Sequence, residues 1–176
     1  MISAAMALVL CLMLMPAGIV SAAEVQTGGY ENGNGLDLNK IGSYISGISN
    51  PDGGVAEIVS YDAVENKAWV VNGATGMLDI LDLNNMEEGA ISATSLDIKA
   101  LATGVNPGFL YGDMTSVSVC ADLRLVAVAL QAEDYDAAGY VGILNTDGEM
   151  LAMIEAGFQP DMVTFTPDGT KILVAN

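Results

Sequence analysis

The 176-residue chain contains no histidine, and only five lysine and arginine residues stand against 22 aspartate and glutamate residues. Without histidine, this chain cannot assemble a Ser-His-Asp or Cys-His nucleophile or bind zinc through imidazole. The net charge of −17 argues against nucleic acid as a partner, because proteins neutralise phosphates with basic side chains. The same charge disfavours direct binding to anionic lipid.

Cysteine is also scarce, with Cys11 and Cys120 as the two thiols. Cys11 lies in the apolar N-terminal run, so Cys120 is left without a partner for an internal disulfide. We expect Cys120 to be a small buried hydrophobic residue in a strand rather than a reactive thiol. The sequence also lacks Asn-x-Ser/Thr acceptors, Walker-type glycine-rich loops and cysteine-rich zinc spacings.

The N-terminus is a nearly unbroken apolar run from Met1 to Val20, followed by the small residues Ser21, Ala22 and Ala23. This pattern predicts a secretory signal peptide over residues 1–23. No Lys or Arg precedes the run, and the alternative is a segment that stays as a membrane anchor, which would be the chain's one contact with a membrane. Residues 24–40 are rich in Gly and Asn and predict a flexible lead.

The most informative pattern is a repeat. Residues 160–176 read as strand, tight turn and strand, and residues 56–72 align with them without a gap. Val59 falls on Val163, Tyr61 on Phe165 and Asn72 on Asn176, and a looser copy spans residues 116–129. Strand pairs that recur at intervals of roughly 45 to 60 residues are typical of propeller blades.

Turn pairs and period-two alternation predict an all-β fold over residues 41–176. No amphipathic helix is expected there, and Met86–Ala90 forms at most one turn. The expected strands of the first blade cover 57–61, 68–72, 77–83 and 91–98, and those of the second start at 115, 125, 140 and 150. The fold class is therefore a partial β-propeller of about two and a half blades.

A third blade begins at Asp161 and is cut off, and a propeller needs about four to eight blades to close. We therefore expect the natural protein to be longer. We also expect the strand edge at Ile172–Asn176 to be prone to association.

Four segments carry a family resemblance: Ile41–Gly47, Ala56–Asp62, Leu78–Leu83 and Pro160–Gly169. Through them, residues 41–176 resemble the opening of a choice-of-anchor I domain, a family that includes proteins named for mesenchyme-specific cell surface glycoproteins. The resemblance implies an exported, seven-bladed propeller of the YVTN and WD40-like type, held at the cell surface by differing C-terminal anchors. It supplies no catalytic residue set.

Two carboxylates are candidates for a metal site. Glu57 and Asp161 stand at equivalent positions at the start of the first strand of their repeats, which lines the central channel of a propeller. A ring of such oxygens suits Ca²⁺, which takes six to eight oxygen ligands. The alternative is that each carboxylate caps or solvates a strand end.

Other polar and aromatic residues have plainer expected roles. Asp62, Asp122 and Asp168 are expected to bond backbone N–H groups in turns. Asn72 and Asn176 are expected to make structural turn bonds, with site lining as the alternative. We expect Trp69 to pack in the core, and Tyr135 to lie in a solvated loop.

These observations favour an exported, cell-surface-associated binding or scaffold module for a surface or extracellular ligand, with a cation in the mouth of its channel. One alternative is the N-terminal part of a phosphatase-associated or hydrolase-like enzyme whose catalytic residues lie beyond residue 176. Another is a truncated reading frame that folds poorly alone. No catalytic residue is assigned within this chain.

Overall fold

The computed structural model describes residues 40–51, 53–86 and 91–176. Residues 41–176 form one unit and residues 1–40 another. The expected signal peptide (1–23), nearly all of the flexible lead (24–40) and most of the Met86–Ala90 turn lie outside the described residues. Within the described part, no helix has the length and apolarity that a membrane span requires.

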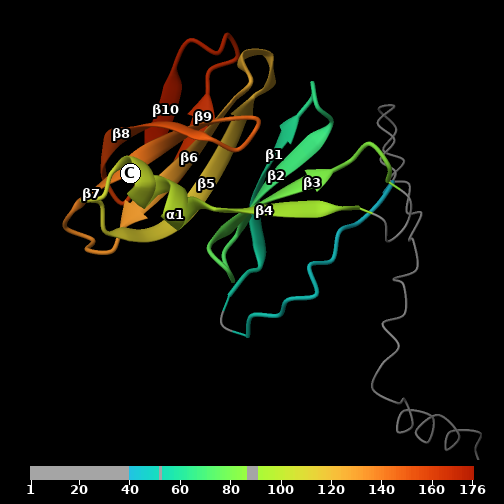
Figure 1. Ribbon diagram of the computed structural model, residues 1–176, viewed down its shortest axis with the longest axis horizontal. Helices are drawn as coiled ribbons and strands as arrows, with labels where there is room; N and C mark the ends of the chain where they lie inside the picture. The colour runs from blue at the N-terminus through green and yellow to red at the C-terminus, as the bar shows by residue number, and fades with distance from the viewer. Residues whose placement is uncertain (1–39, 52, 87–90) are drawn as a thin grey trace, which may run out of the picture. The chain divides into compact units, whose positions relative to one another are not determined.

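Two four-stranded antiparallel sheets and one hairpin make up the fold (Figure 1). Blade 1 consists of β1 (Ala56–Asp62), β2 (Lys67–Asn72), β3 (Met77–Asp82) and β4 (Ala93–Asp97). Blade 2 consists of β5 (Tyr111–Cys120), β6 (Leu125–Ala132), β7 (Ala138–Asn145) and β8 (Met150–Phe158). The hairpin consists of β9 (Met162–Phe165) and β10 (Ile172–Ala175). The prediction of an all-β partial propeller is confirmed.

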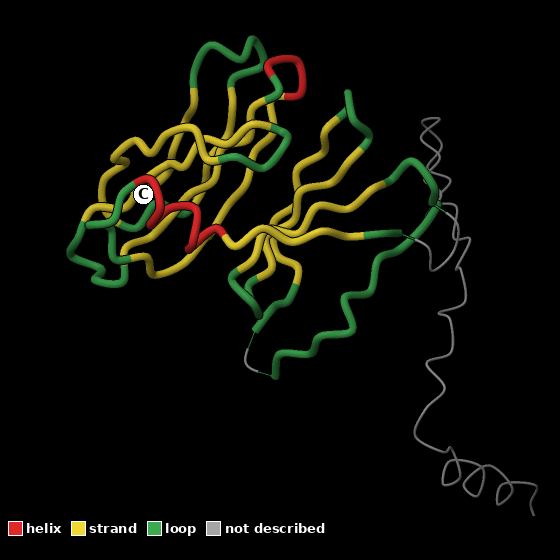
Figure 2. The backbone as a smooth tube through the Cα atoms, in the orientation of Figure 1, coloured by secondary structure: helices red, strands yellow, loops and turns green. Residues whose placement is uncertain are grey.

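One short helix contradicts the sequence-based expectation. α1 (Ile98–Val105) follows β4 at once, so the strand expected over 91–98 ends at Asp97 (Figure 2). The Asp97 carboxylate caps the helix by accepting a hydrogen bond of 2.9 Å from the Ala100 N–H. Its eight residues include Thr103 and Gly104, which weaken helix propensity, and only Ile98 and Ala102 are buried. Two buried positions are too few for a readable helical period.

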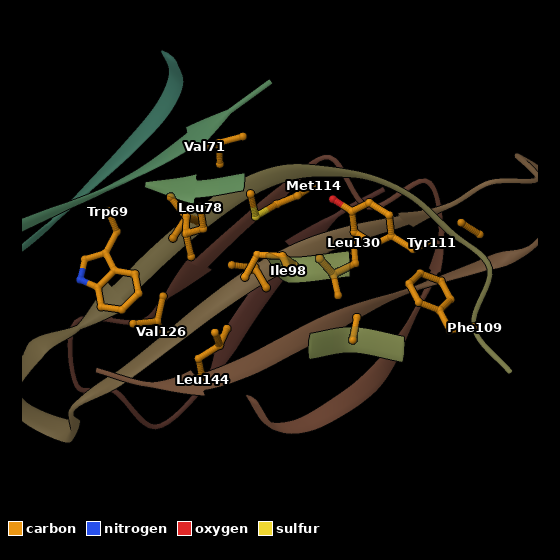
Figure 3. Close-up of a cluster of buried hydrophobic side chains, with 14 residues drawn as sticks. Trp69, Val71, Leu78, Ile98, Phe109, Tyr111, Met114, Val126, Leu130 and Leu144 are labelled. Atoms are coloured by element: carbon orange, nitrogen blue, oxygen red, sulfur yellow. The ribbon is translucent and has the colours of Figure 1, made fainter. Parts of the chain in front are cut away.

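The main core lies between the two blades. Trp69 and Leu78 of blade 1 pack in one cluster with Val126 and Leu144 of blade 2, and all four are fully buried (Figure 3). A second cluster joins blade 2 to the hairpin through Ala127, Ala129 and Val163. Successive residues of β6 therefore face different cores, which explains why this strand is apolar on both faces. Burial of Trp69 confirms its predicted core role.

The first strands of neighbouring repeats lie in contact, β1 with β5 and β5 with β9. A strand edge carries N–H groups that its own sheet does not satisfy. The Ser60 hydroxyl of β1 accepts a hydrogen bond of 2.9 Å from the Val119 N–H of β5. In the same way, the Ser118 hydroxyl of β5 accepts one of 3.2 Å from the Phe165 N–H of β9. Serine side chains of one repeat thus cap the strand edge of the next.

This contact repeats by position. Ser60 lies opposite Trp69 in the β1–β2 hairpin, and Ser118 lies opposite Ala127 in the β5–β6 hairpin. In both hairpins two more residue pairs lie between the serine and the turn, so the two serines occupy equivalent positions. The chain between the sheets differs in length, since residues 98–110 join β4 to β5 whereas residues 159–161 join β8 to β9. The same hydroxyl bond therefore forms across a long connection and across a short one.

We predict that Ser118→Ala lowers the free energy of unfolding by about 1–2 kcal/mol, because it leaves the Phe165 N–H without an acceptor. Urea denaturation measures the loss, and hydrogen exchange should show faster exchange of the Phe165 amide. The matched control is Ser92→Ala, an exposed serine whose hydroxyl makes no hydrogen bond within the described residues. An unchanged exchange rate at Phe165 would contradict the proposed role of the hydroxyl.

A second inter-blade contact centres on Glu65, in the turn between β1 and β2. Its carboxylate lies 2.5 Å from Lys67 Nζ and 2.9 Å from Arg124 Nη2, and it accepts a hydrogen bond of 3.0 Å from the Thr146 hydroxyl. Arg124 and Thr146 belong to turns of blade 2. The hydrogen bond from Lys67 is the main reason that the pKa of Glu65 lies below its ordinary value of 4.5, with Thr146 and Arg124 acting in the same direction.

We predict that Glu65→Gln destabilises the protein by about 1 kcal/mol at pH 7. Because the pKa of Glu65 is lower in the folded than in the unfolded protein, the ionised carboxylate stabilises the fold at every pH above the unfolded-state pKa. This stability is lost as the pH falls through the folded-state pKa and the carboxylate becomes protonated. The wild type should therefore lose more stability than the variant when the pH falls below 4.5. Urea titrations at several pH values test this, with the exposed Asp122→Asn as control; parallel pH curves for wild type and Glu65→Gln would refute it.

Candidate functional site

Hydrogen bonds between the blades align the strands β1, β5 and β9, so that their first residues lie at the same end of the sheets. We call this end, marked by Ala56, Tyr111 and Met162, the loop end. Exposed carboxylates gather in its loops and strand termini, and they are Glu57, Asp97, Asp113, Glu133, Asp134, Asp136 and Asp161. Lys99 is the one basic residue there among those described. The ion pairs in the described part all lie at the opposite end, on Glu65 and Asp147. Negative charge at the loop end is therefore not neutralised by neighbouring side chains.

Glu57 lies in a β-bulge of β1, where the pairing with β2 shifts between Ala56 and Val59. A bulge re-aims the side chain that it carries. The Glu57 carboxylate lies over the turn after β2, and a Cβ at Gly73 would come within 2.5 Å of Oε1. Gly73 therefore leaves room for the carboxylate at the loop end.

Asp161 is exposed and directly precedes β9, and its N–H donates a hydrogen bond of 2.8 Å to the Ala175 carbonyl. In blade 2 the matching position is Thr115, which also lies in a bulge and donates a hydrogen bond of 2.7 Å to the Pro160 carbonyl. The three positions thus carry Glu, Thr and Asp. Sequence reasoning missed Thr115 because only the register of the hairpins reveals the match.

No contact is seen between the Glu57 and Asp161 carboxylates. Across residues 40–51, 53–86 and 91–176, no cluster of three or more His, Cys, Asp or Glu side chains could hold a metal ion. Ca²⁺ takes six to eight oxygen ligands, so these two residues alone do not complete a site. The cation site stays a prediction.

Asn72 belongs to a buried polar group that the sequence did not reveal. Its Nδ2 donates a hydrogen bond of 2.8 Å to Asp79 Oδ2, and the Ser95 hydroxyl donates one of 2.5 Å to Asp79 Oδ1. Asn72 Oδ1 accepts from the Thr75 N–H at 3.2 Å, which confirms the predicted turn bond. Asp79 is nearly fully buried, and neutral donors bond both of its oxygens. These bonds fix the β2–β3 turn beside Glu57.

The turn aspartates mostly behave as predicted. Asp62 Oδ1 accepts from the N–H groups of Val64 and Glu65, and Asp168 Oδ1 accepts from the Thr170 N–H. The Thr166 hydroxyl is the main cause of the lowered pKa of Asp168. Asp122 lies in a 3₁₀ turn, but its carboxylate bonds none of the described residues. Its predicted turn bond is wrong.

Buried polar atoms without a partner occur in the described part at Asp62 Oδ2, Trp69 Nε1 and the Tyr111 hydroxyl. Burial, followed by the negative charges of Asp113 and Asp97, raises the pKa of Tyr111 far above its ordinary range. Tyr111 is therefore a neutral phenol at physiological pH.

Cys120 is free but only half-buried, so the expected full burial is not reached.

The comparisons with known proteins add one family and one structure. A search of curated proteins found no match. The hydrazine synthase of Kuenenia stuttgartiensis is similar over 76% of this chain and 32% of its own, with a TM-score of 0.45 and 14% identity. This chain thus spans about a third of that protein's length. Likeness at this level supports no conclusion about fold or activity.

The model of the choice-of-anchor I domain matches residues 57–176, from the bulge of β1 through β10. This range contains both blades and the hairpin, and it covers well over half of the chain. The family's name associates the domain with anchoring at the cell surface. The chain belongs to the choice-of-anchor I domain family.

Proposed function

We propose that the chain is part of an exported β-propeller that acts as a binding or scaffold module at the cell surface, and that its loop end binds a divalent cation such as Ca²⁺. The observation that carries the proposal is the separation of charge. Carboxylates at the loop end are exposed and have no basic partner among the described residues, whereas those around Glu65 are ion-paired. Unpaired negative charge attracts cations and cationic ligands.

Glu57 and Asp161 are the proposed protein ligands. Both are exposed, and Gly73 leaves the Glu57 carboxylate free to turn toward the end of the sheets. Because two carboxylates cannot satisfy Ca²⁺, the remaining oxygens would come from water, from further blades or from the bound ligand itself. A cation in this position would then bridge the module to an anionic or oxygen-rich surface ligand.

Export is proposed from the apolar run and the small residues of positions 1–23, together with the surface association of the family. The strong acidity suits a protein that must stay soluble outside the cell, since like charges oppose association. The surface or extracellular partner is defined by its chemistry as one that presents anionic or oxygen-rich groups, which complete the coordination of the bound cation.

We predict that 10 mM Ca²⁺ raises the melting temperature of a chelator-treated sample by about 3–8 °C, as expected for a site with the millimolar to submillimolar affinity of extracellular modules. The double variant Glu57→Gln and Asp161→Asn should lose most of this rise. Differential scanning calorimetry measures the rise in melting temperature. The sample without Ca²⁺ contains NaCl at the same ionic strength, so that general screening of charge does not cause a difference.

The matched control is Asp122→Asn, an exposed carboxylate at the opposite end of the sheets. It should keep the full Ca²⁺ response. An unchanged melting temperature of the wild type, or equal responses of the double variant and the control, would count against the site.

A further inference from the structure

A pocket of about 400 Å³ lies between the outer strands of blade 1 and the β7–β8 turn of blade 2. It lies at the end of the sheets opposite the loop end, because β3 ends and β4 begins there. Its volume falls in the range of small-molecule sites, which starts at about 300 Å³. Only blades 1 and 2 line the pocket, and each of them has four strands.

The floor of the pocket is apolar. Ile80 of β3 and Leu96 of β4 line it, and both pack against the main core between the blades. The β7–β8 turn closes one side, since a Cβ at Gly148, which has a φ of +91°, would lie 3.1 Å from the end of the Leu96 side chain. Thr146 of the same turn is buried, and its hydroxyl donates a hydrogen bond to Glu65 of blade 1. Contacts between the two blades therefore preform the pocket.

The rim of the pocket offers hydrogen-bond donors and acceptors that other side chains do not occupy. Lys67 Nζ carries three hydrogens, and in the described part of the chain it bonds the Glu65 carboxylate and no second carboxylate. Asp82 accepts both bonds from Asn84 through Oδ1, so its Oδ2 bonds no described residue. The hydroxyl of Thr94, an exposed residue, also bonds none of the described residues. A ligand in the pocket can therefore both accept and donate hydrogen bonds.

Charge around the pocket is nearly balanced, and ion pairs join most of the charged groups. The carboxylates are those of Glu65, Asp82 and Asp147, and the cations are Lys67 and Arg124. Three carboxylates against two cations leave one negative charge, whereas the loop end has seven exposed carboxylates and one lysine among the described residues. An anion in the pocket would meet Asp82 and Asp147, and a cation would meet Lys67. A neutral ligand meets neither repulsion.

We propose that the pocket binds a neutral sugar unit. A sugar ring suits the site because its C–H groups form an apolar face, while its hydroxyls both donate and accept hydrogen bonds. The apolar face lies on Ile80 and Leu96. Of the polar groups at the rim, Lys67 donates to the sugar, Asp82 accepts from it and Thr94 does either. This site does not depend on the proposed cation binding, since it lies at the other end of the sheets.

The test uses the whole chain, with the methyl glycosides of glucose, galactose and mannose as neutral probes. Saturation-transfer NMR detects binding, and a titration gives the dissociation constant, which we expect at about 1–10 mM for at least one probe. The amino sugar and the uronic acid that correspond to the best-bound probe place an ammonium or a carboxylate on the same ring. Both should bind less tightly than the neutral probe.

Two variants test the assigned residues. Asp82→Asn should weaken binding about tenfold, because it removes a charged acceptor, and Thr94→Val should weaken it about threefold, because it removes a neutral hydroxyl. Both changes keep the size of the side chain, and an unchanged melting temperature shows that the variant is folded. The matched control is Asp122→Asn, an exposed carboxylate outside the pocket, which should bind the probe as the wild type does.

Three results would overturn the proposal. The first is the absence of saturation transfer to all three methyl glycosides, and the second is equal affinity of the wild type and both folded variants. The third is tighter binding of a charged sugar than of the neutral one, with an affinity that falls as salt is added, because the ligand would then be an ion.

A trisaccharide that ends in the best-bound unit distinguishes the two sources of such a sugar. Binding at least as tight as that of the single unit assigns the pocket to the end of a surface glycan. Weaker binding of the trisaccharide assigns it to a free sugar. Each outcome supports a sugar site and names its source.

Discussion

The relative position of neighbouring repeats is fixed by a hydrogen bond that recurs at the same place, from a backbone N–H of one first strand to the serine hydroxyl of the preceding first strand. Sheets stacked only through apolar faces can slide, since dispersion and hydrophobic contacts have little directionality. A hydroxyl at a fixed place in an alternating strand removes that freedom. Because Ser60 and Ser118 lie at the same distance from their turns, both pairs of neighbouring sheets have the same offset along the strand direction.

The sequence predicted the sheets well and their contacts poorly. Hairpin turns and alternating residues are local signals, so the strands around Val59, Val70 and Val163 could be placed from composition and period alone. Ser60 and Ser118 look like ordinary solvent-facing residues in that pattern. Their role depends on which edges of distant strands meet, and a single sequence does not encode this in any local form.

The polar contacts also divide into local ones, which the sequence predicts, and contacts between distant residues, which it does not. Asp62 and Asp168 bond within their own turns, and such bonds can be predicted from a few neighbouring residues. Glu65 reaches Arg124 and Thr146 of the next blade, and Asp79 bonds Ser95 on the neighbouring strand, so neither group could be found without the fold. The match of Thr115 with Glu57 and Asp161 also required the register. The candidate cation site was therefore predicted as a ring of carboxylates, whereas the structure interrupts that ring in blade 2.

The unequal connections between sheets have a consequence for how such a domain can change. Thirteen positions, 98–110, separate β4 from β5, and they hold a helix, whereas residues 159–161 suffice between β8 and β9. Since the first strands meet in the same way in both cases, the spacing of the blades does not depend on the length of the linker. Connections at the loop end can therefore lengthen, shorten or change their residues while the sheets keep their positions. A fold of this kind can accept insertions in its surface loops at little cost to folding.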